Sequence, residues 1–193
     1  MTRLLLAGAA ALALGACAHT AEHGDHAHHH GDHGAAEAHT PELAVAKATM
    51  LGADGLEIGW ARFEQGPHGV LIRMELAPGS LTPGWHGLHL HEVGDCSDPG
   101  SYMLSGGHHG KAPGAHGLMN PEGPEEGDLP NVWAASDGSA GYEAFTTLTE
   151  LVPALNGDGL SIIIHANEDD HRSQPIGGAG PRVACGVVAR AEP

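Results

Sequence analysis

The stretch Trp85-His86-Gly87-Leu88-His89-Leu90-His91-Glu92 alternates polar and apolar side chains with the period of a β-strand. Successive side chains of a strand point to opposite faces, so His89 and His91 share one face and Leu88 and Leu90 share the other. Two imidazoles side by side on a rigid strand form half of a site for copper or zinc. The stretch therefore predicts a β-sheet and a pair of metal ligands on it.

Seven further segments have strand-like patterns and are separated by turns rich in Gly, Asp, Asn and Pro. These expected strands are 43–50, 57–64, 69–76, 131–135, 140–147, 160–166 and 183–190. Eight short strands without a long helix predict an all-β fold, an eight-stranded Greek-key barrel or sandwich. Two connections, 93–130 and 167–181, are too long for hairpins, and we expect them to carry function.

The charge balance excludes one class of partner. The 193 residues contain 8 Lys and Arg against 24 Asp and Glu, a formal net charge of −16. Binding to nucleic acid needs clustered Lys and Arg to contact phosphates, so no nucleic-acid partner is expected. The length suits one domain with a sizeable core, here 43–193, preceded by an N-terminal extension.

The first 17 residues are typical of an export signal. Met1-Thr2-Arg3 precedes eleven residues drawn from Leu, Ala and Gly, which is too short a run to span a bilayer. The segment ends in Leu-Gly-Ala-Cys, which resembles a bacterial lipobox with acylation at Cys17. Ordinary cleavage after Ala18 is the alternative. We expect a periplasmic or envelope protein that contacts a membrane only through a lipid anchor.

Residues 18–42 form a tail without apolar periodicity, which we expect to be disordered. The segment holds eight of the 17 histidines of the chain, namely His19, His23, His26, His28, His29, His30, His33 and His39. Clustered imidazoles bind Cu(II) or Zn(II) weakly and exchangeably, so metal ions are expected partners of the tail. The alternative is a solvated spacer that lifts the domain off the membrane.

Counting cysteines predicts one disulfide. With Cys17 assigned to the lipobox, Cys96 and Cys185 remain as an even pair in an exported chain. Such a pair is oxidised by default in an oxidising compartment.

Other candidate ligands surround the pair His89 and His91. They are His108, His116 and Asp128 in the long connection and His165 at the end of a later strand. The segments 86–96 (His-Gly-Leu-His-Leu-His-Glu-Val-Gly-Asp-Cys) and 178–187 (Gly-Ala-Gly-Pro-Arg-Val-Ala-Cys-Gly-Val) resemble the two signatures of the copper/zinc superoxide dismutases. Residues 107–108, 116–121 and 127–131 resemble the intervening loop of bacterial members, so the similarity covers about 43–190.

The resemblance implies a role for each matching residue. The implied copper ligands are His89, His91, His108 and His165. His108 is expected to bridge copper to a zinc ion that His116 and Asp128 also bind. Asp169 is expected to link copper and zinc ligands from outside, and His86 to support the copper ligands by hydrogen bonding. Cys96 and Cys185 match the disulfide of the family.

One position departs from the family pattern. Three residues before Asp128, where the family usually has a third histidine that binds zinc alone, this chain has Glu125. A carboxylate can bind zinc, so a site of two histidines, Glu125 and Asp128 is one expectation. The alternative is an empty or weak second site, with His108 as an ordinary copper ligand.

The implied reaction is the disproportionation of superoxide to dioxygen and hydrogen peroxide, a defence against superoxide outside the cytoplasm. Arg182 matches the arginine that guides the substrate, and Lys111 is a weaker candidate for this role. The alternative function is a tethered copper- and zinc-buffering lipoprotein. A buffer would not need Arg182, Asp169 and the disulfide together, so the enzyme is favoured. His68 and His171 are expected to be surface residues, and the sequence leaves monomer and homodimer open.

Overall fold

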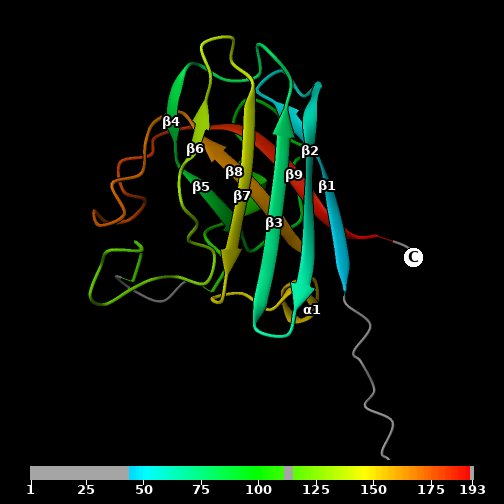
Figure 1. Cartoon of the computed structure of the whole chain (residues 1–193), viewed down its shortest axis with the longest axis vertical. Coiled ribbons are helices and arrows are strands. Elements are labelled where there is room, and N and C mark those ends of the chain that lie inside the picture. Colours follow the sequence, from blue (N-terminus) through cyan, green and yellow to red (C-terminus); the bar gives the residue numbers. More distant parts are fainter. Residues whose placement is uncertain (1–43, 111–114, 192–193) are drawn as a thin grey trace, which may run out of the picture. The chain divides into compact units, whose positions relative to one another are not determined.

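The computed structural model of the chain describes residues 44–110 and 115–191. The expected signal segment with Cys17, the histidine-rich tail and Lys111 lie outside the described residues. The described part folds into one antiparallel sheet of nine strands (Figure 1). The strands are β1 (Val45–Gly52), β2 (Glu57–Gly66), β3 (Gly69–Leu76), β4 (Gly84–His86), β5 (Leu88–His91), β6 (Val132–Ala134), β7 (Ala140–Thr146), β8 (Leu160–His165) and β9 (Arg182–Arg190).

The sheet curls into a nearly closed barrel. Its strand order is β4-β6-β7-β3-β2-β1-β9-β8-β5, so the two edge strands, β4 and β5, are consecutive in the chain. Two pairs of neighbouring strands are distant in the chain, β3 with β7 and β1 with β9. The connections between strands therefore cross over as in a Greek key. The expectation of an all-β barrel is confirmed.

The expected single strand over 85–92 is wrong, because the structure divides it at Gly87. β4 pairs with β6 while β5 pairs with β8, so the chain changes from one edge of the sheet to the other at this glycine. The N–H of Gly87 donates to the carbonyl of Asn167 (2.8 Å) instead of to a neighbouring strand. A Cβ at Gly87 would lie 2.8 Å from that of Ala179, so only glycine lets the loop approach this closely. The number of strands is therefore nine rather than eight.

The alternation read from the sequence places apolar side chains inside the barrel. In β3, Val70, Ile72, Met74 and Leu76 are buried, while Arg73 and Glu75 face solvent. Strand β8 is buried along its whole length, because loops cover the face that turns away from the barrel interior. This covered face is where the histidines gather.

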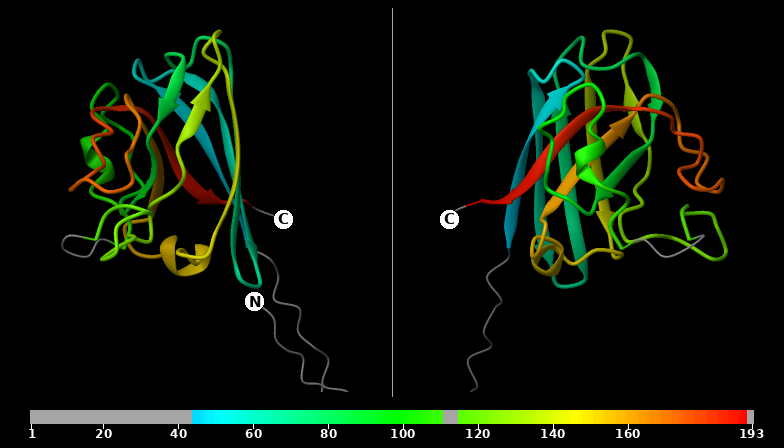
Figure 2. Two further views of the ribbon diagram at one scale, coloured as in Figure 1. Left: turned by 60° about the vertical axis from the view of Figure 1, so that its left-hand side comes forward. Right: turned by 180° about the vertical axis from the view of Figure 1, so that it is seen from behind.

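The two long loops lie on the same side of the barrel, outside β5 and β8 (Figure 2). The first loop contains the short 3₁₀ helix η1 (Met103–Ser105), and a single helical turn, α1 (Leu151–Ala154), precedes β8. The disulfide Cys96–Cys185 ties the first loop to β9, which confirms the expected pairing. Within the described ranges, no helix is long and apolar enough to cross a membrane.

Candidate metal centre

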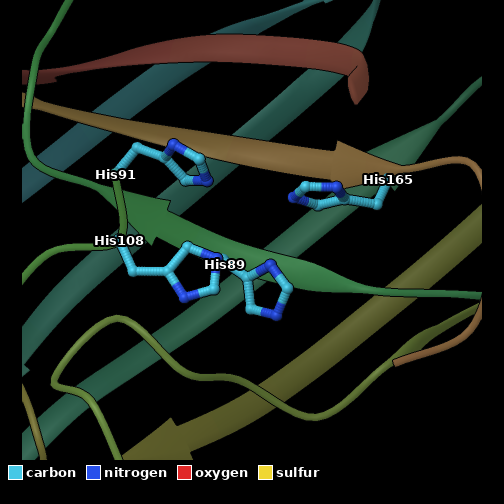
Figure 3. A group of neighbouring side chains, drawn as sticks. All are labelled: His89, His91, His108 and His165. Carbon is cyan, nitrogen blue, oxygen red and sulfur yellow. The ribbon is translucent and has the colours of Figure 1, made fainter. Parts of the chain in front are cut away.

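Four histidines from three segments converge outside the barrel wall (Figure 3). His89 and His91 lie on β5, and His165 ends β8. His108 is brought beside them by an isolated β-bridge to His91. The four side chains are buried, and one ring nitrogen from each lies within 4.8 Å of the others.

Each of these four rings has one nitrogen held by the protein. Nε2 of His89 lies 2.8 Å from Asp169 Oδ2, and Nδ1 of His108 lies 2.6 Å from Glu125 Oε2. Nδ1 of His91 and Nδ1 of His165 lie 3.1 Å and 2.8 Å from the carbonyls of Gly106 and Gly180. The opposite nitrogens have no hydrogen-bond partner within the described part of the chain; they are His89 Nδ1, His91 Nε2, His108 Nε2 and His165 Nε2.

Buried polar atoms are normally hydrogen-bonded, because leaving one unpaired costs about 1–3 kcal/mol. Four unpaired imidazole nitrogens in one place therefore need another partner. A metal ion that accepts four nitrogen donors fits this arrangement, and all-imidazole ligation suits copper.

The protonation state of these histidines also suits metal binding. Burial lowers the pKa of His89 to about 3 and that of His165 to about 4. Burial lowers the pKa of His91 well below its usual value, and the positive charge of Arg182 adds to the effect. The three rings are therefore neutral near pH 7, which is the form that binds a metal.

A second group of ligand atoms overlaps the first at His89 and His108. It comprises atoms of His89, His108, His116 and Asp128 within 4.8 Å of one another. Asp128 Oδ1 lies 2.8 Å from His116 Nδ1 and 3.4 Å from His108 Nδ1. Asp128 Oδ2 accepts hydrogen bonds from the N–H groups of Gly117 (2.7 Å) and Glu125 (2.9 Å). The backbone thus aims Oδ1 of Asp128 at the two imidazoles.

Glu125 contributes a further oxygen to the second group. Its Oε2 lies 2.6 Å from His108 Nδ1 and 3.7 Å from His116 Nδ1. Tetrahedral zinc with bonds of 2.0–2.1 Å holds its ligand atoms about 3.3 Å apart. The distances from Nδ1 of His108 and of His116 to the oxygens of Glu125 and Asp128 lie between 2.6 and 3.7 Å, on both sides of this value. The residues present therefore fit a zinc ion.

Asp169 connects the two groups. Its Oδ2 lies 2.8 Å from His89 Nε2 and its Oδ1 lies 3.3 Å from His116 Nε2. Burial opposes the charge of Asp169, but hydrogen bonds with His116 and His89 outweigh it and hold the pKa of this carboxyl well below its usual range. A charged carboxylate that contacts one imidazole of each group fixes both ring orientations.

Sequence reasoning missed the residues that hold Asp169. The side-chain amide of Asn131 donates to the carbonyl of Asp169 (2.8 Å) and accepts from its N–H (3.0 Å). His171, expected at the surface, donates its backbone N–H to Asp169 Oδ1 (2.7 Å), and its ring Nδ1 lies 3.5 Å from Oδ2. Asn131 and Asp169 are 38 residues apart, so no local pattern could have revealed the contact.

His86 lies behind the four-histidine group. Its Nδ1 is 2.8 Å from the carbonyl of His165, and its Nε2 is 2.7 Å from the carbonyl of Thr82. The ring therefore ties the strand β4 to the end of β8, at the point where His165 leaves the sheet.

Arg182 lies at the rim of a pocket of about 450 Å³ that opens onto the metal centre. His91, His108 and His165 also line this pocket. The guanidinium donates to the carbonyl of Tyr102 (2.5 Å), to Ser105 Oγ (2.9 Å) and to the carbonyl of Gly106 (2.7 Å). These three acceptors belong to the disulfide-tied loop, so the loop fixes a positive charge beside the histidines.

The barrel and the two adjoining groups define a metal-binding β-barrel protein with a four-histidine site beside a site of mixed histidine and carboxylate donors. The family model for copper/zinc superoxide dismutase (SODC) matches residues 57–188. The chain belongs to the copper/zinc superoxide dismutase family of enzymes.

Individual relatives support this assignment. The superoxide dismutase [Cu-Zn] of Caulobacter vibrioides is 48% identical over 150 residues, which cover 74% of this chain and 84% of the relative. Superoxide dismutase [Cu-Zn] 1 of Aquifex aeolicus is 35% identical over 147 residues, covering 73% and 85%.

Solved structures show the same fold. A SOD-like protein from Bacillus subtilis superposes with a TM-score of 0.67 at 29% identity, covering 74% of this chain and 97% of the other. The Cu/Zn superoxide dismutase from Brucella abortus gives 0.62 at 28% identity, covering 75% and 99%.

The lowered pKa values predict how the stability of the metal-free protein depends on pH. His165 and His89 bind protons in the unfolded chain below about pH 6.5, but in the folded protein only near their pKa values of about 4 and about 3. The free energy of unfolding should therefore fall as the pH drops from 6.5 to 4, by at most about 1 kcal/mol per pH unit for each histidine. Urea unfolding of metal-free protein across this range measures the change.

His116 does not oppose this trend. Burial disfavours its charge, but hydrogen bonds with Asp128 and Asp169 outweigh burial and raise its pKa to about 10. Its stabilising contribution is complete below pH 6.5 and is lost only as the pH rises through about 10. A metal-free protein equally stable at pH 6.5 and pH 4 would contradict the account of buried neutral imidazoles.

Proposed function

We propose that the chain disproportionates superoxide to dioxygen and hydrogen peroxide at a copper ion held by His89, His91, His108 and His165. One observation carries the proposal: four buried imidazole nitrogens without partners converge, in the described structure, beside a pocket that Arg182 also lines. Membership of the copper/zinc superoxide dismutase family supplies the reaction.

Bound copper would supply the one-electron oxidation and reduction that the reaction needs. The chain does the rest. Asp169 and the carbonyls of Gly106 and Gly180 fix the orientations of three imidazoles, whose free nitrogens would hold the ion. Arg182 attracts the superoxide anion into the pocket, which matters because the formal net charge of the chain is −16.

The second group is proposed as the zinc site, with His108, His116, Glu125 and Asp128 as ligands. Support comes from the distances among these donors and from the two N–H groups that orient Asp128. His108 places Nδ1 beside Glu125 while its Nε2 is left without a hydrogen-bond partner in the described structure, so this ring would hold one ion through each nitrogen.

Copper storage alone explains the geometry less well. A storage protein has no need of a cation at the entrance to its metal site, since a cation repels incoming metal ions. Here three hydrogen bonds hold Arg182 at the pocket. This arrangement favours an anionic substrate.

Exchanging one copper ligand tests the proposed function. The His91→Ala variant should lose both its stoichiometric copper and its dismutation activity. Alanine removes one of the four nitrogen donors and leaves a cavity in its place. His68→Ala, at an exposed position, is the matched control and should keep both. Copper per protein after gel filtration and superoxide decay in the same sample are the two readouts. Dismutation that persists unchanged in His91→Ala would refute the proposed site.

A glycine pair tests the link between the two sites. Gly177 and Gly178 both have positive φ (59° and 73°), so alanine costs similar backbone strain at either position. A Cβ at Gly177 would overlap Oδ1 of Asp169, whereas one at Gly178 would meet nothing within 4 Å. Gly177→Ala should weaken zinc retention about 10- to 100-fold by displacing the Asp169 carboxylate, and Gly178→Ala should not. Zinc content after dialysis against a chelator measures this, and equal retention would contradict the role of Asp169.

We also propose that the protein is exported and anchored in the cell envelope through a lipid on Cys17. The lipobox-like sequence before Cys17 supports the anchor, and the disulfide is consistent with an oxidising compartment. Radiolabelled palmitate should label the protein in bacterial cells, and Cys17→Ser should abolish the label. Label retained by Cys17→Ser would refute the anchor.

The histidine-rich tail is proposed to collect metal for the two sites. Its support is composition alone, eight histidines within residues 18–42. Deleting residues 19–39 should slow copper loading from a chelator-buffered solution without changing the final copper content of the barrel. Equal loading rates would leave the tail as a spacer.

A further inference from the structure

Glu125 is a buried carboxylate in the second group. Its side chain is 3% exposed, and its Oε2 contacts His108 Nδ1 at 2.6 Å. The backbone holds the residue in place, because its N–H donates to Asp128 Oδ2 (2.9 Å) and its carbonyl accepts from the N–H of Asp128 (3.2 Å). The next residue, Glu126, has a side chain that is 56% exposed and lies 3.4 Å from His109 Nε2. Only the first of these adjacent carboxylates faces the metal donors.

Glu125 changes the chemistry of the donor set. With it, the proposed zinc ligands offer two nitrogens, from His108 and His116, and two carboxylate oxygens, while the first group offers four nitrogens. Copper(II) binds more tightly than zinc(II) to a given set of ligands, and imidazole is a copper-favouring donor, whereas carboxylates suit harder ions. Exchanging an imidazole for a carboxylate therefore reduces the advantage of copper over zinc.

The two groups are close enough for this difference to matter. They share His89 and His108, so a copper ion that reaches the pocket meets both. A second site with one more imidazole would compete more strongly with the first for copper. Exchanging that imidazole for the Glu125 carboxylate weakens this competition.

We infer that Glu125 is a metal-specificity determinant of the second site, where it lowers the preference for copper(II) over zinc(II). The inference rests on the proposed copper and zinc sites. It assigns to this side chain a contribution to the sorting of copper and zinc between the two sites.

Competitive loading of the full-length protein tests the inference. Metal-free protein is equilibrated with copper and zinc together in a chelator buffer, and the ions retained are counted by mass spectrometry. Glu125→His should raise the copper-to-zinc ratio at the second site on the order of tenfold. Glu126→His, which adds the same imidazole one residue away, should leave the ratio unchanged. The histidine-rich tail is identical in every variant, so any copper that it binds adds the same amount to each measurement and does not affect the comparison.

The outcomes separate this inference from the proposed function. Equal ratios for Glu125→His, Glu126→His and the wild-type protein, with the four-histidine site filled by copper, would overturn the inference alone. A four-histidine site that takes no stoichiometric copper would overturn the proposed function as well. If Glu125→His fails to form the disulfide-bonded barrel, Glu125→Gln carries the test. In the same competitive loading, loss of the carboxylate in Glu125→Gln should raise the copper-to-zinc ratio at the second site, Glu126→Gln should leave it unchanged, and equal ratios would overturn the inference.

Discussion

Arg182→Ala should lower the second-order rate constant for superoxide disproportionation about 10- to 100-fold, because the pocket loses the cation that attracts the anion. The chain has a formal net charge of −16, so little else draws superoxide toward the copper ligands. The guanidinium is held by the carbonyls of Tyr102 and Gly106 rather than by a carboxylate, and its charge is not cancelled by a direct ion pair among the described residues. Decay of a superoxide pulse at low ionic strength measures the rate.

The dependence on salt sharpens this test. In Arg182→Ala only the net negative charge remains, so screening should raise the rate of the variant as ionic strength increases. The wild-type rate should fall or stay level. Arg62→Ala is the control, because Arg62 pairs with Glu64 on strand β2, away from the pocket. An Arg182→Ala protein as fast as Arg62→Ala would show that the arginine does not guide the substrate.

Removing the disulfide should cost about 4–5 kcal/mol of unfolding free energy, because the bond closes a long loop in the unfolded chain. The two cysteines are separated by 89 positions. Urea unfolding of metal-free Cys96→Ala/Cys185→Ala protein, compared with the oxidised wild type, gives the difference. A loss below about 1 kcal/mol would contradict the expectation that the bond is a main restraint on this chain.

The same variant should lose activity for a separate reason. Cys96 lies in the loop whose Tyr102 and Gly106 hold Arg182. The two cysteines and Tyr102 belong to one buried cluster with Ile163. Without the bond the arginine is less well positioned, so the rate should fall even at temperatures where the barrel stays folded. Copper content, measured in parallel, separates loss of the metal from loss of the arginine position.

Strand periodicity predicted much of the barrel. The segment 69–76 coincides with β3, because its apolar residues alternate without interruption between two turns. The first strand begins and ends two residues later than expected, at Val45 and Gly52, since pairing with β9 extends it past Met50. The break at Gly87 was not visible, because it depends on a loop about 80 residues further along the chain that packs against it.

The side chains proposed as metal ligands were recognisable because their spacing is local or matches the family signatures. The residues that position them were not. Asn131 acts through backbone groups of Asp169, and the loop holds Arg182 mainly through carbonyl oxygens, which any residue type offers. Tyr102 is held in place by a hydrogen bond from its hydroxyl to the carbonyl of Gly52, a contact that exists only in the folded chain. Such contacts leave no pattern of residue types in a single sequence.

The central claim is that copper held by the four histidines makes this chain a dismutase. The most direct measurement is the rate of superoxide decay with the copper-loaded protein in excess chelator, which silences free copper and copper on the tail. We predict a rate constant approaching the diffusion ceiling of about 10⁸–10⁹ M⁻¹s⁻¹, abolished in metal-free protein. A slow rate that is the same with and without copper would contradict the account and leave a copper-holding barrel.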